Sequence, residues 1–376
     1  MKKKVYVGMS GGVDSSVVAM MLRDQGYEVI GVFIKTWQPD YIECTWREDR
    51  LDAMRVAAQL DIKFETLDLS HEYKTGVIDY MISEYMLGRT PNPDVMCNSE
   101  VKFGAFYNYI KSIDKQAYIA TGHYAKIIYN DTTQVYIASD NKLNISLAKA
   151  NDKGKDQVYF LAQIDKDILP YIIFPLGEMK KSEVRDIARN NNLYVSEKKD
   201  SQGLCMLGDI SIKDFLQKEI GVQPYGNIFD LNNEIIGRHN GAILYTIGER
   251  IAVNNKDTER SVYYVKSKDI KNNTIIATTL TNTFNEQVNS RVGETFILKS
   301  WNSTSSIEIF ENKVYACQSR YHGPLSKIKI LEISKADSDK NIILNIEILN
   351  KDMLLVSGQT LVIYDDNMML GGGIIA

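Results

Sequence analysis

Residues 5–21 read VYVGMSGGVDSSVVAMM, and this stretch decides the fold of the N-terminal half. Val5 to Val7 is a short apolar run typical of a buried strand, a loop rich in glycine and serine follows, and an apolar helical pattern comes next. A strand, a glycine-rich loop and a helix in this order form a phosphate-binding layout, because backbone N–H groups and the positive end of the helix dipole point at the anion. We therefore expect an α/β fold whose first loop binds phosphate.

Strand and helix patterns alternate from this loop to about residue 125. We expect strands at 27–34, 63–69 and 117–125, and helices at 14–26, 49–61 and 73–88. Such alternation implies a doubly wound parallel sheet, in which ligands bind beyond the carboxyl ends of the strands. Met9 to Ser16 and Gly122 to Tyr124 both fall at such ends.

The pattern changes after about residue 205. One helix is expected at 211–220, and glycine-punctuated short strands follow it. From about residue 290 only short strands with turn signals remain, which is typical of a small β-barrel or sandwich. We predict three domains, at 1–205, 206–284 and 285–376.

The composition is that of an ordinary globular protein, with 44% hydrophobic and 24% charged residues and a net charge of −4. No apolar run approaches the roughly 18 residues that span a bilayer, and the basic start lacks a signal-peptide core, so we expect a cytoplasmic protein without a membrane partner. The four cysteines form no Cys-x-x-Cys pair, which disfavours a structural zinc site and a secreted disulfide scaffold. Cys317 alternates with apolar residues, which favours packing, and the role of Cys44 stays open.

The glycine-rich loop lacks the lysine that usually contacts the β- and γ-phosphates of a nucleotide, and it has Asp14 instead. A carboxylate beside phosphates is repulsive unless it holds Mg²⁺. The loop is therefore expected to bind the pyrophosphate part of ATP with a metal, which suits cleavage between the α- and β-phosphates and release of AMP.

Two cysteines lie in polar segments. Cys97 belongs to GRTPNPDVMCNSEVKFG (88–104), where two prolines are expected to fix a loop and Asp94 stands three residues before the cysteine. Cys205 belongs to SEKKDSQGLCMLGD (196–209), where lysines precede a glycine-bearing loop. Each cysteine could be a buried small hydrophobe or a reactive thiol whose pKa is lowered by nearby cations.

The loop resembles that of the PP-loop ATP pyrophosphatases. Over nearly the whole chain, the sequence also resembles the tRNA-specific 2-thiouridylases, which thiolate the wobble uridine of tRNA. The motifs that carry this resemblance are GMSGGVDSS, GRTPNPDVMCN with VKF, ATGHYA, KDQVYFL, DSQGLCMLGD, GRHNGAILYTIGER, SRYHGPLSKI and GQTLVIYDDNMMLGGGII.

The resemblance implies a mechanism. The C2 oxygen of uridine attacks the α-phosphorus of ATP, pyrophosphate leaves, and AMP later departs as sulfur arrives. Cys205 is implied to carry the sulfur as a persulfide, and Cys97 to release it, which leaves a Cys97–Cys205 disulfide. Asp94 is implied either to transfer a proton or to contact the target base, and these roles stay open.

The resemblance also implies binding residues and partners. ATP is expected at Gly8, Met9, Ser10, Gly11, Gly12, Val13, Asp14, Ser15, Ile34 and Gly122, with Mg²⁺ at Asp14. The tRNA is expected at Asn92, Pro93, Asp94, His123, Lys155, Asp156, Gln157, Arg320, Tyr321 and Gln359. A sulfur-donor protein or a cysteine desulfurase is the expected second partner, and the basic clusters between Lys149 and Lys199 are expected to form the electrostatic footprint of tRNA.

Some positions depart from the family pattern. Glu249 follows Tyr-Thr-Ile-Gly where glutamine is usual, and RYHGP stands where Arg-Tyr-Arg-Gln is usual. These departures bear on tRNA docking rather than on adenylation. The alternatives are another PP-loop enzyme, similar to lysidine synthetase, which needs no mobile cysteines, and a nucleotide-sensing or RNA-binding module that never cleaves ATP.

Overall fold

The computed structural model describes residues 2–42, 46–129, 132–133, 145–199, 210–253, 262–279, 292–335, 342–350 and 353–376. Cys44 and Cys205 lie outside these described residues, and so do the expected domain boundaries after residues 205 and 284. The geometry of Cys205 and the boundaries themselves therefore stay predictions.

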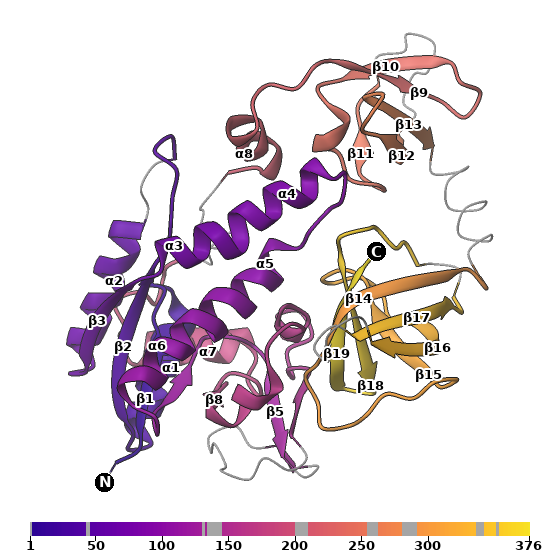
Figure 1. Cartoon of the computed structure of the whole chain (residues 1–376). Helices are drawn as coiled ribbons and strands as arrows, with labels where there is room; N and C mark the ends of the chain where they lie inside the picture. Colours follow the sequence, from indigo (N-terminus) through magenta and orange to yellow (C-terminus); the bar gives the residue numbers. More distant parts are fainter. Residues whose placement is uncertain are drawn as a thin grey trace.

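A five-stranded parallel sheet forms the N-terminal part, in the order β3-β2-β1-β4-β8 (Figure 1). Its strands are β1 (Lys4–Gly8), β2 (Glu28–Lys35), β3 (Lys63–Asp68), β4 (Tyr118–Ala120) and β8 (Ile172–Ile173). The chain order reverses beside β1, because β2 pairs with one edge of β1 and β4 with the other. The expected α/β fold is confirmed, and the loop after β1 lies at the switch point where such sheets bind ligands.

The three helices that the sequence pattern predicts in this part are confirmed, helices at 106–113 and 181–190 come in addition, and one segment is an exception because it was expected to be a loop. They are α1 (Val13–Asp24), α2 (Trp46–Gln59), the consecutive α3 (Ser70–Tyr73), η1 (Lys74–Asp79) and α4 (Tyr80–Met86), the consecutive α5 (Pro93–Met96), η2 (Cys97–Ala105) and α6 (Phe106–Ile113), and α7 (Lys181–Asn190). Two short 3₁₀ helices are also present, η3 (Val158–Leu161) and η4 (Lys166–Tyr171). Among the described residues, no helix combines the length and the apolar character needed to cross a membrane.

The exception is the segment that was expected to be a loop at 88–104. A helix begins at Pro93, because the side chain of Asn92 accepts a hydrogen bond from the Val95 N–H at 3.2 Å and proline is tolerated in the first turn. Cys97 therefore lies inside a helical rod, not in a loop.

A small middle domain follows α8 (Ile212–Glu219). Its sheet has the order β10-β9-β13-β12-β11. The strands are β9 (Gly226–Phe229), β10 (Ile235–His239), β11 (Arg250–Ile251), β12 (Tyr263–Asp269) and β13 (Thr274–Thr279), and the 3₁₀ turn η5 (Ala242–Leu244) follows β10. Its separate core includes Ile228, Val265 and Ile275, each at most 1% exposed.

The C-terminal part is a closed six-stranded barrel, as expected. Its strands are β14 (Thr295–Ser303), β15 (Val314–Gln318), β16 (Ser326–Lys335), β17 (Ile342–Ile348), β18 (Thr360–Asp365) and β19 (Met368–Ile375). The barrel closes because β14 pairs with both β17 and β19. Cys317 is fully buried in its core, where burial raises the pKa of the thiol to about 12, so its expected packing role is confirmed.

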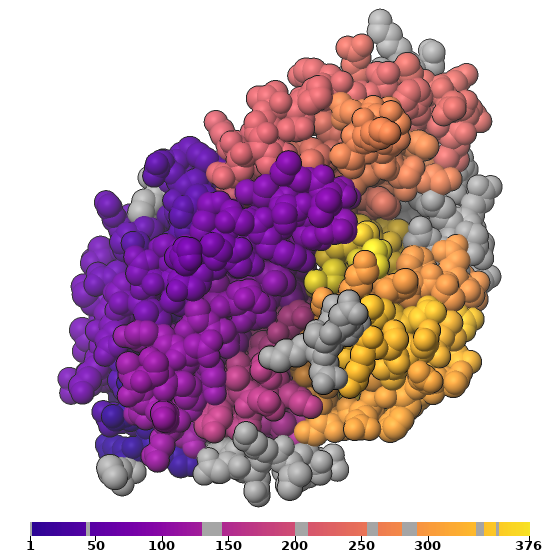
Figure 2. All heavy atoms as spheres, viewed as in Figure 1, coloured from indigo at the N-terminus to yellow at the C-terminus, as the bar shows by residue number. Residues whose placement is uncertain are grey.

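The barrel is joined to the N-terminal part by strands that the sequence patterns did not predict. β5 (Lys126–Tyr129) and β7 (Ile145–Ala148) form a ribbon with β6 (Thr132–Thr133), and β7 pairs with β19 of the barrel. Asn302 adds hydrogen bonds from its Nδ2 to the carbonyls of Ala162 (3.2 Å) and Ile164 (2.8 Å). Figure 2 shows the resulting contact between the magenta and yellow parts of the chain.

Gly372 allows β19 of the barrel to pack closely against Ala162 of the N-terminal part. A Cβ at this position would lie 2.7 Å from the Cβ of Ala162. We expect Gly372→Ala to lower the free energy of unfolding by about 1–3 kcal/mol, measured by urea denaturation, since overpacking forces backbone shifts.

Gly154→Ala is the matched control, because the added Cβ would have its nearest neighbour at 3.4 Å. Adding Ala162→Gly to Gly372→Ala should recover part of the loss. Equal stability of Gly372→Ala and the wild type would refute this close approach.

Candidate nucleotide and thiol site

The loop after β1 has a backbone that only glycine allows at one position. Gly11 has φ +74°, and a Cβ there would lie 2.2 Å from the carbonyl oxygen of Asp49 on α2. The loop thus packs closely against the start of α2. This contact holds the N–H groups of the loop in place before a ligand binds.

The side chains of the loop divide into two sets. Met9 and Val13 point into the core, with at most 4% exposed, so they can offer a ligand only their backbone. The hydroxyl of Ser15 accepts a hydrogen bond from the N–H of Ser10 at 3.2 Å, and the fully buried Ser16 donates to the carbonyl of Gly12 at 2.7 Å. The buried hydroxyls therefore shape the loop.

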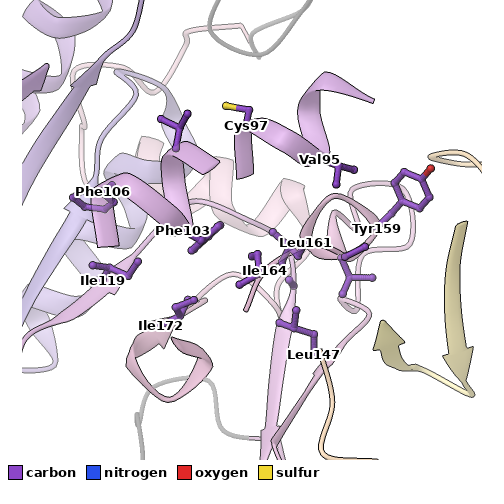
Figure 3. Packing of buried hydrophobic residues seen from close by; sticks show 14 of the residues in the cluster. Val95, Cys97, Phe103, Phe106, Ile119, Leu147, Tyr159, Leu161, Ile164 and Ile172 are labelled. Carbon is purple, nitrogen blue, oxygen red and sulfur yellow. The ribbon is translucent and has the colours of Figure 1, made fainter. Parts of the chain in front are cut away.

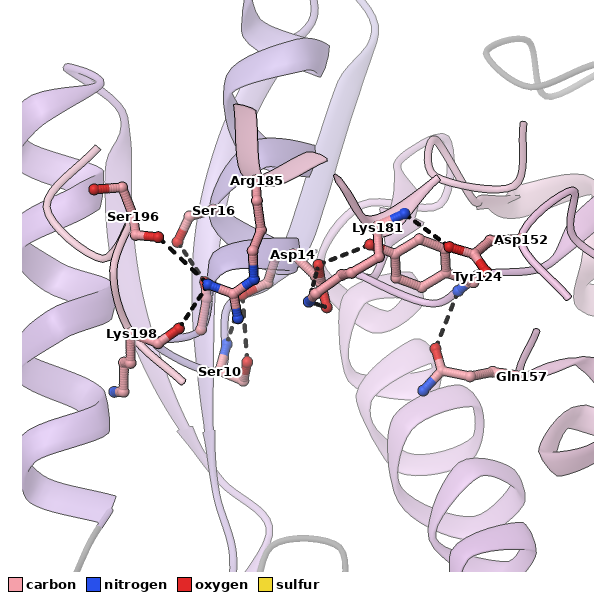
Figure 4. Close-up of polar contacts among 12 residues, drawn as sticks. Ser10, Asp14, Ser16, Tyr124, Asp152, Gln157, Lys181, Arg185, Ser196 and Lys198 are labelled. Atoms are coloured by element: carbon pink, nitrogen blue, oxygen red, sulfur yellow. Dashed lines mark hydrogen bonds and ion pairs between the residues drawn. The ribbon is translucent and has the colours of Figure 1, made fainter. Parts of the chain in front are cut away.

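Asp14 is the point at which three segments meet (Figure 4). The Nζ of Lys181, at the start of α7, lies 2.8 Å from each of its carboxylate oxygens, and the hydroxyl of Tyr124 donates to Oδ1 at 3.0 Å. The backbone N–H of Lys181 donates to Asp152 at 2.8 Å, which fixes the beginning of the helix. A lysine therefore stands at the loop, although it comes from 167 residues away in sequence.

The segment after β4 closes one side of the loop. A Cβ at Gly122 would lie 2.9 Å from the N of Ser15 and 3.0 Å from the Cβ of Asp14. The N–H of Tyr124 donates to the side chain of Gln157 at 3.1 Å. The strand-end positions Gly8 and Gly122 are thus adjacent to one loop, and Ile34 lies near the carboxyl end of the neighbouring β2, as parallel pairing of β1 with β2 requires.

Some side chains of the basic clusters between 149 and 199 form ion pairs and hydrogen bonds within the protein. Lys198 lies 2.7 Å from both Asp49 and Asp52 of α2, and the guanidinium of Arg185 donates to the Lys198 carbonyl at 3.0 Å. Together with Lys181, these residues tie α7 to the loop. The expectation that the basic clusters form the electrostatic footprint of tRNA stays a prediction, and these three side chains also have partners inside the protein.

His123 is a buried, neutral histidine. Only 8% of it is exposed, its Nδ1 lies 2.7 Å from the Thr121 hydroxyl, and its ring lies 5.6 Å from that of Phe103 and 6.1 Å from that of Phe174. Burial, together with the charge of Lys102, holds the pKa of His123 well below its usual 6.5. Its contact with Phe103 couples the segment after β4 to the helix that carries Cys97.

Cys97 is fully buried in the same apolar cluster as Phe103 and Phe106 (Figure 3). Asn98 donates to the carbonyl of Asp94 at 2.9 Å, so the first helical turn is also held by a side chain. Neither Cys97 nor Cys317, the two cysteines within the described residues, forms a disulfide.

A buried tyrosine gathers the expected tRNA-binding positions of two domains. The hydroxyl of Tyr159 donates to the carbonyl of Thr360 at 2.8 Å and is hydrogen-bonded to the side chain of Asn92. Its ring lies 6.5 Å from that of Tyr321, and Gln359 directly precedes Thr360. Asn92 and Tyr321 thus contact Tyr159, and Gln359 adjoins its hydrogen-bond partner Thr360 in the sequence. Tyr159 lies in the motif KDQVYFL, but no role was assigned to it from the sequence.

The remaining expected tRNA-binding residues differ in exposure. Arg320 is exposed and Lys155 is half-buried. Asp156 accepts a hydrogen bond from the Ala150 N–H at 2.7 Å, and burial raises the pKa of its carboxyl. The carboxylate of Asp156 and the side-chain oxygen of Gln157 therefore face the protein, whereas Arg320 can face a ligand.

The described residues provide no group of three or more His, Cys, Asp or Glu side chains that could hold a metal ion by themselves. Mg²⁺ usually binds through one or two carboxylates together with substrate phosphates. Asp14, with 30% of its side chain exposed beside the loop, fits that kind of shared coordination.

The neutral state of His123 predicts a pH effect on stability. In the unfolded chain its pKa returns to about 6.5, so below that pH the unfolded state binds a proton that the folded state does not. The stabilising difference is present above pH 6.5 and is lost toward lower pH, by up to about 1.4 kcal/mol per pH unit.

We expect the unfolding free energy of the wild type to fall faster between pH 7.5 and 5.5 than that of His123→Gln, measured by urea denaturation. The exposed His71→Gln serves as the control and should follow the wild-type profile. Parallel profiles for the wild type and His123→Gln would contradict a neutral buried His123.

Known families match all three parts of the chain. The models of a tRNA methyl transferase HUP domain, a tRNA methyl transferase PRC-barrel domain and an aminomethyltransferase β-barrel domain match residues 3–209, 213–278 and 293–375. Among solved structures, a U34-tRNA thiolase from Methanococcus maripaludis covers 58% of this chain and 67% of its own, at 19% identity and a TM-score of 0.32, which adds nothing to the assignment.

Curated relatives match over their whole length. The tRNA-specific 2-thiouridylase MnmA of Methylobacillus flagellatus is 37% identical over 100% of this chain and 99% of its own. That of Listeria innocua is 38% identical over 99% and 94%. The chain belongs to the family of tRNA-specific 2-thiouridylases.

Proposed function

We propose that the protein is a tRNA-uridine 2-sulfurtransferase that adenylates the C2 oxygen of the wobble uridine with ATP and replaces it with sulfur. The observation that carries this proposal is the loop at Gly8 to Ser16, which has Asp14 in place of its own lysine and lies beside the segment that contacts the Cys97 helix. Full-length similarity to 2-thiouridylases supports the choice of substrate.

Adenylation uses the nucleotide loop. The uridine oxygen attacks the α-phosphorus, the bond to the β-phosphate breaks, and pyrophosphate is stabilised by the N–H groups of the loop and by the start of α1. Asp14 would hold Mg²⁺, which neutralises charge on the leaving pyrophosphate when it is bound. AMP then becomes the leaving group that the C2 oxygen alone could not be.

Sulfur transfer uses the two cysteines. The terminal sulfur of a Cys205 persulfide attacks C2, and AMP leaves with the former carbonyl oxygen. The thiolate of Cys97 attacks Sγ of Cys205 and cleaves the S–S bond of the persulfide, which forms a Cys97–Cys205 disulfide and leaves the second sulfur on C2. A thiol reductant restores both cysteines, and a sulfur-donor protein or cysteine desulfurase recharges Cys205. Asp94, one helical turn before Cys97, either transfers a proton or contacts the base.

The tRNA would meet the surface formed by the start of the Cys97 helix and the neighbouring edge of the barrel. Asn92, Pro93 and Asp94 start the Cys97 helix, and Gln359 lies on the barrel beside them. The N–H of Thr90 donates to the carbonyl of Ser357 at 2.8 Å, which joins the two parts. Chemistry on a base requires that the base leave the stack, so we expect the target uridine to flip out toward this junction.

The deciding experiment is nucleoside mass spectrometry of unmodified tRNA after incubation with the protein, ATP, Mg²⁺, a thiol reductant and a persulfide donor, namely a cysteine desulfurase with cysteine. ATP-dependent 2-thiouridine is the expected result. Pyrophosphate release without 2-thiouridine, in the presence of the persulfide donor, would favour a lysidine-type nucleophile, and absence of both would favour a module without turnover.

We expect Cys205→Ala to abolish 2-thiouridine formation while tRNA-dependent pyrophosphate release continues, because adenylation does not involve the thiols. Cys97→Ala should stop turnover with a persulfide donor in the same way. Cys317→Ala, a change in the barrel core, is the control and should retain thiolation in proportion to folded protein. Loss of both activities in folded Cys205→Ala would contradict the separation of the two steps.

A further inference from the structure

We propose that Lys181 is the phosphate-binding lysine of the nucleotide loop, delivered from α7 and held in place by Asp14 until a nucleotide binds. This deepens the proposed function only in assuming that the loop binds the phosphates of ATP. It does not depend on which atom of tRNA is later adenylated.

The first support is the position of the ammonium group. Nζ of Lys181 lies 2.8 Å from both oxygens of Asp14, which is in the first turn of α1. That turn is where the N–H groups of the loop point. Only 12% of the Lys181 side chain is exposed, so its ammonium group stays at the loop and does not sample many positions in solvent.

The second support is the way in which Lys181 is anchored. Its backbone N–H donates to Asp152 at 2.8 Å, and α7 is tied to the loop's other side through Arg185 and Lys198, which reaches Asp49. The backbone of Lys181 is therefore fixed, and only its side-chain torsions need to rotate for Nζ to leave one anion for another.

The third support is charge balance. A carboxylate beside the loop repels phosphates, whereas an ammonium paired with that carboxylate brings the local charge to zero. When ATP arrives with Mg²⁺, the phosphates can draw Lys181, and the carboxylate of Asp14 is then released toward the metal. The salt bridge thus keeps two groups next to each other before ATP binds: the ammonium of Lys181, which would bind phosphate, and the carboxylate of Asp14, which would bind Mg²⁺.

The test measures equilibrium binding of ATP and of inorganic pyrophosphate by calorimetry, with no tRNA present. Lys181→Met keeps most of the aliphatic stem and should weaken ATP binding about 10- to 100-fold, as expected for loss of a charged hydrogen bond. Lys180→Ala is the matched control, because Lys180 precedes it with an exposed side chain, and it should bind as the wild type does.

A double-mutant comparison separates a phosphate ligand from a mere counter-ion of Asp14. In EDTA, Asp14→Asn should strengthen pyrophosphate binding about fivefold, since a repulsive charge worth roughly 1 kcal/mol is removed and Lys181 is released. Lys181→Met should remain weak in the Asp14→Asn background, and that double variant carries no unpaired carboxylate that could prevent folding.

Unchanged binding by Lys181→Met would overturn the proposal. So would full recovery of binding in the double variant, which would reduce Lys181 to a neutraliser of Asp14. Failure of 2-thiouridine formation in the wild type, with intact Lys181-dependent ATP binding, would refute the proposed reaction and leave this inference standing.

Discussion

The site depends on the ion pair and the hydrogen bond that the carboxylate of Asp14 forms with Lys181 and Tyr124. This carboxylate joins α1 to the start of α7 through Lys181 and to the segment after β4 through Tyr124. A partly buried charge is costly without partners, so the three segments stabilise each other's positions only as a set. The glycine loop is consequently shaped before a nucleotide binds, and less conformational entropy remains to be lost on binding.

A second constraint fixes the barrel relative to this site. Pairing of β7 with β19 continues the barrel into a sheet extension from the N-terminal part, and Tyr159 hydrogen-bonds to both Asn92 and Thr360. The barrel is therefore docked rather than tethered. The middle domain contacts the N-terminal part through, for example, the 3.3 Å hydrogen bond between the hydroxyls of Thr90 and Thr246. Residues from separate domains can thus present one surface to a large substrate.

Local patterns were enough to predict the strand, loop and helix at residues 4–24. The apolar strand, the glycines and serines of the loop and the apolar period of the helix follow one another directly in the sequence. The ribbon of β5 and β7 was missed since its partner, β19, lies more than 200 residues away. The helix at Cys97 was missed for a different reason. Asn92 followed by Pro93 is a helix-start signal, but the prolines were interpreted as breakers.

The same limit applies to the candidate site. The loop sequence shows that the usual lysine is missing, but local patterns did not place Lys181 beside Asp14, because the two residues are 167 positions apart. Lys181 belongs to the basic clusters between Lys149 and Lys199, which were assigned to tRNA from the sequence. An Asp inside a phosphate loop, paired with a search for a lysine at a helix start, is the signal that could have found it.

The site also separates two chemical environments. The loop side is polar and charged, while Cys97, Phe103 and the neutral His123 form an apolar side in the same fold. An adenylated uridine is an electrophile that water can attack, and a persulfide is a nucleophile that small oxidants can attack. Under the proposed function, the burial of Cys97 among aromatic rings would limit the access of water and small oxidants to its thiol. The segment at residues 122–124 contacts each environment, because Tyr124 donates to Asp14 and the ring of His123 packs against Phe103. Under the proposed function, this segment would keep the nucleotide chemistry next to Cys97 yet separate from it.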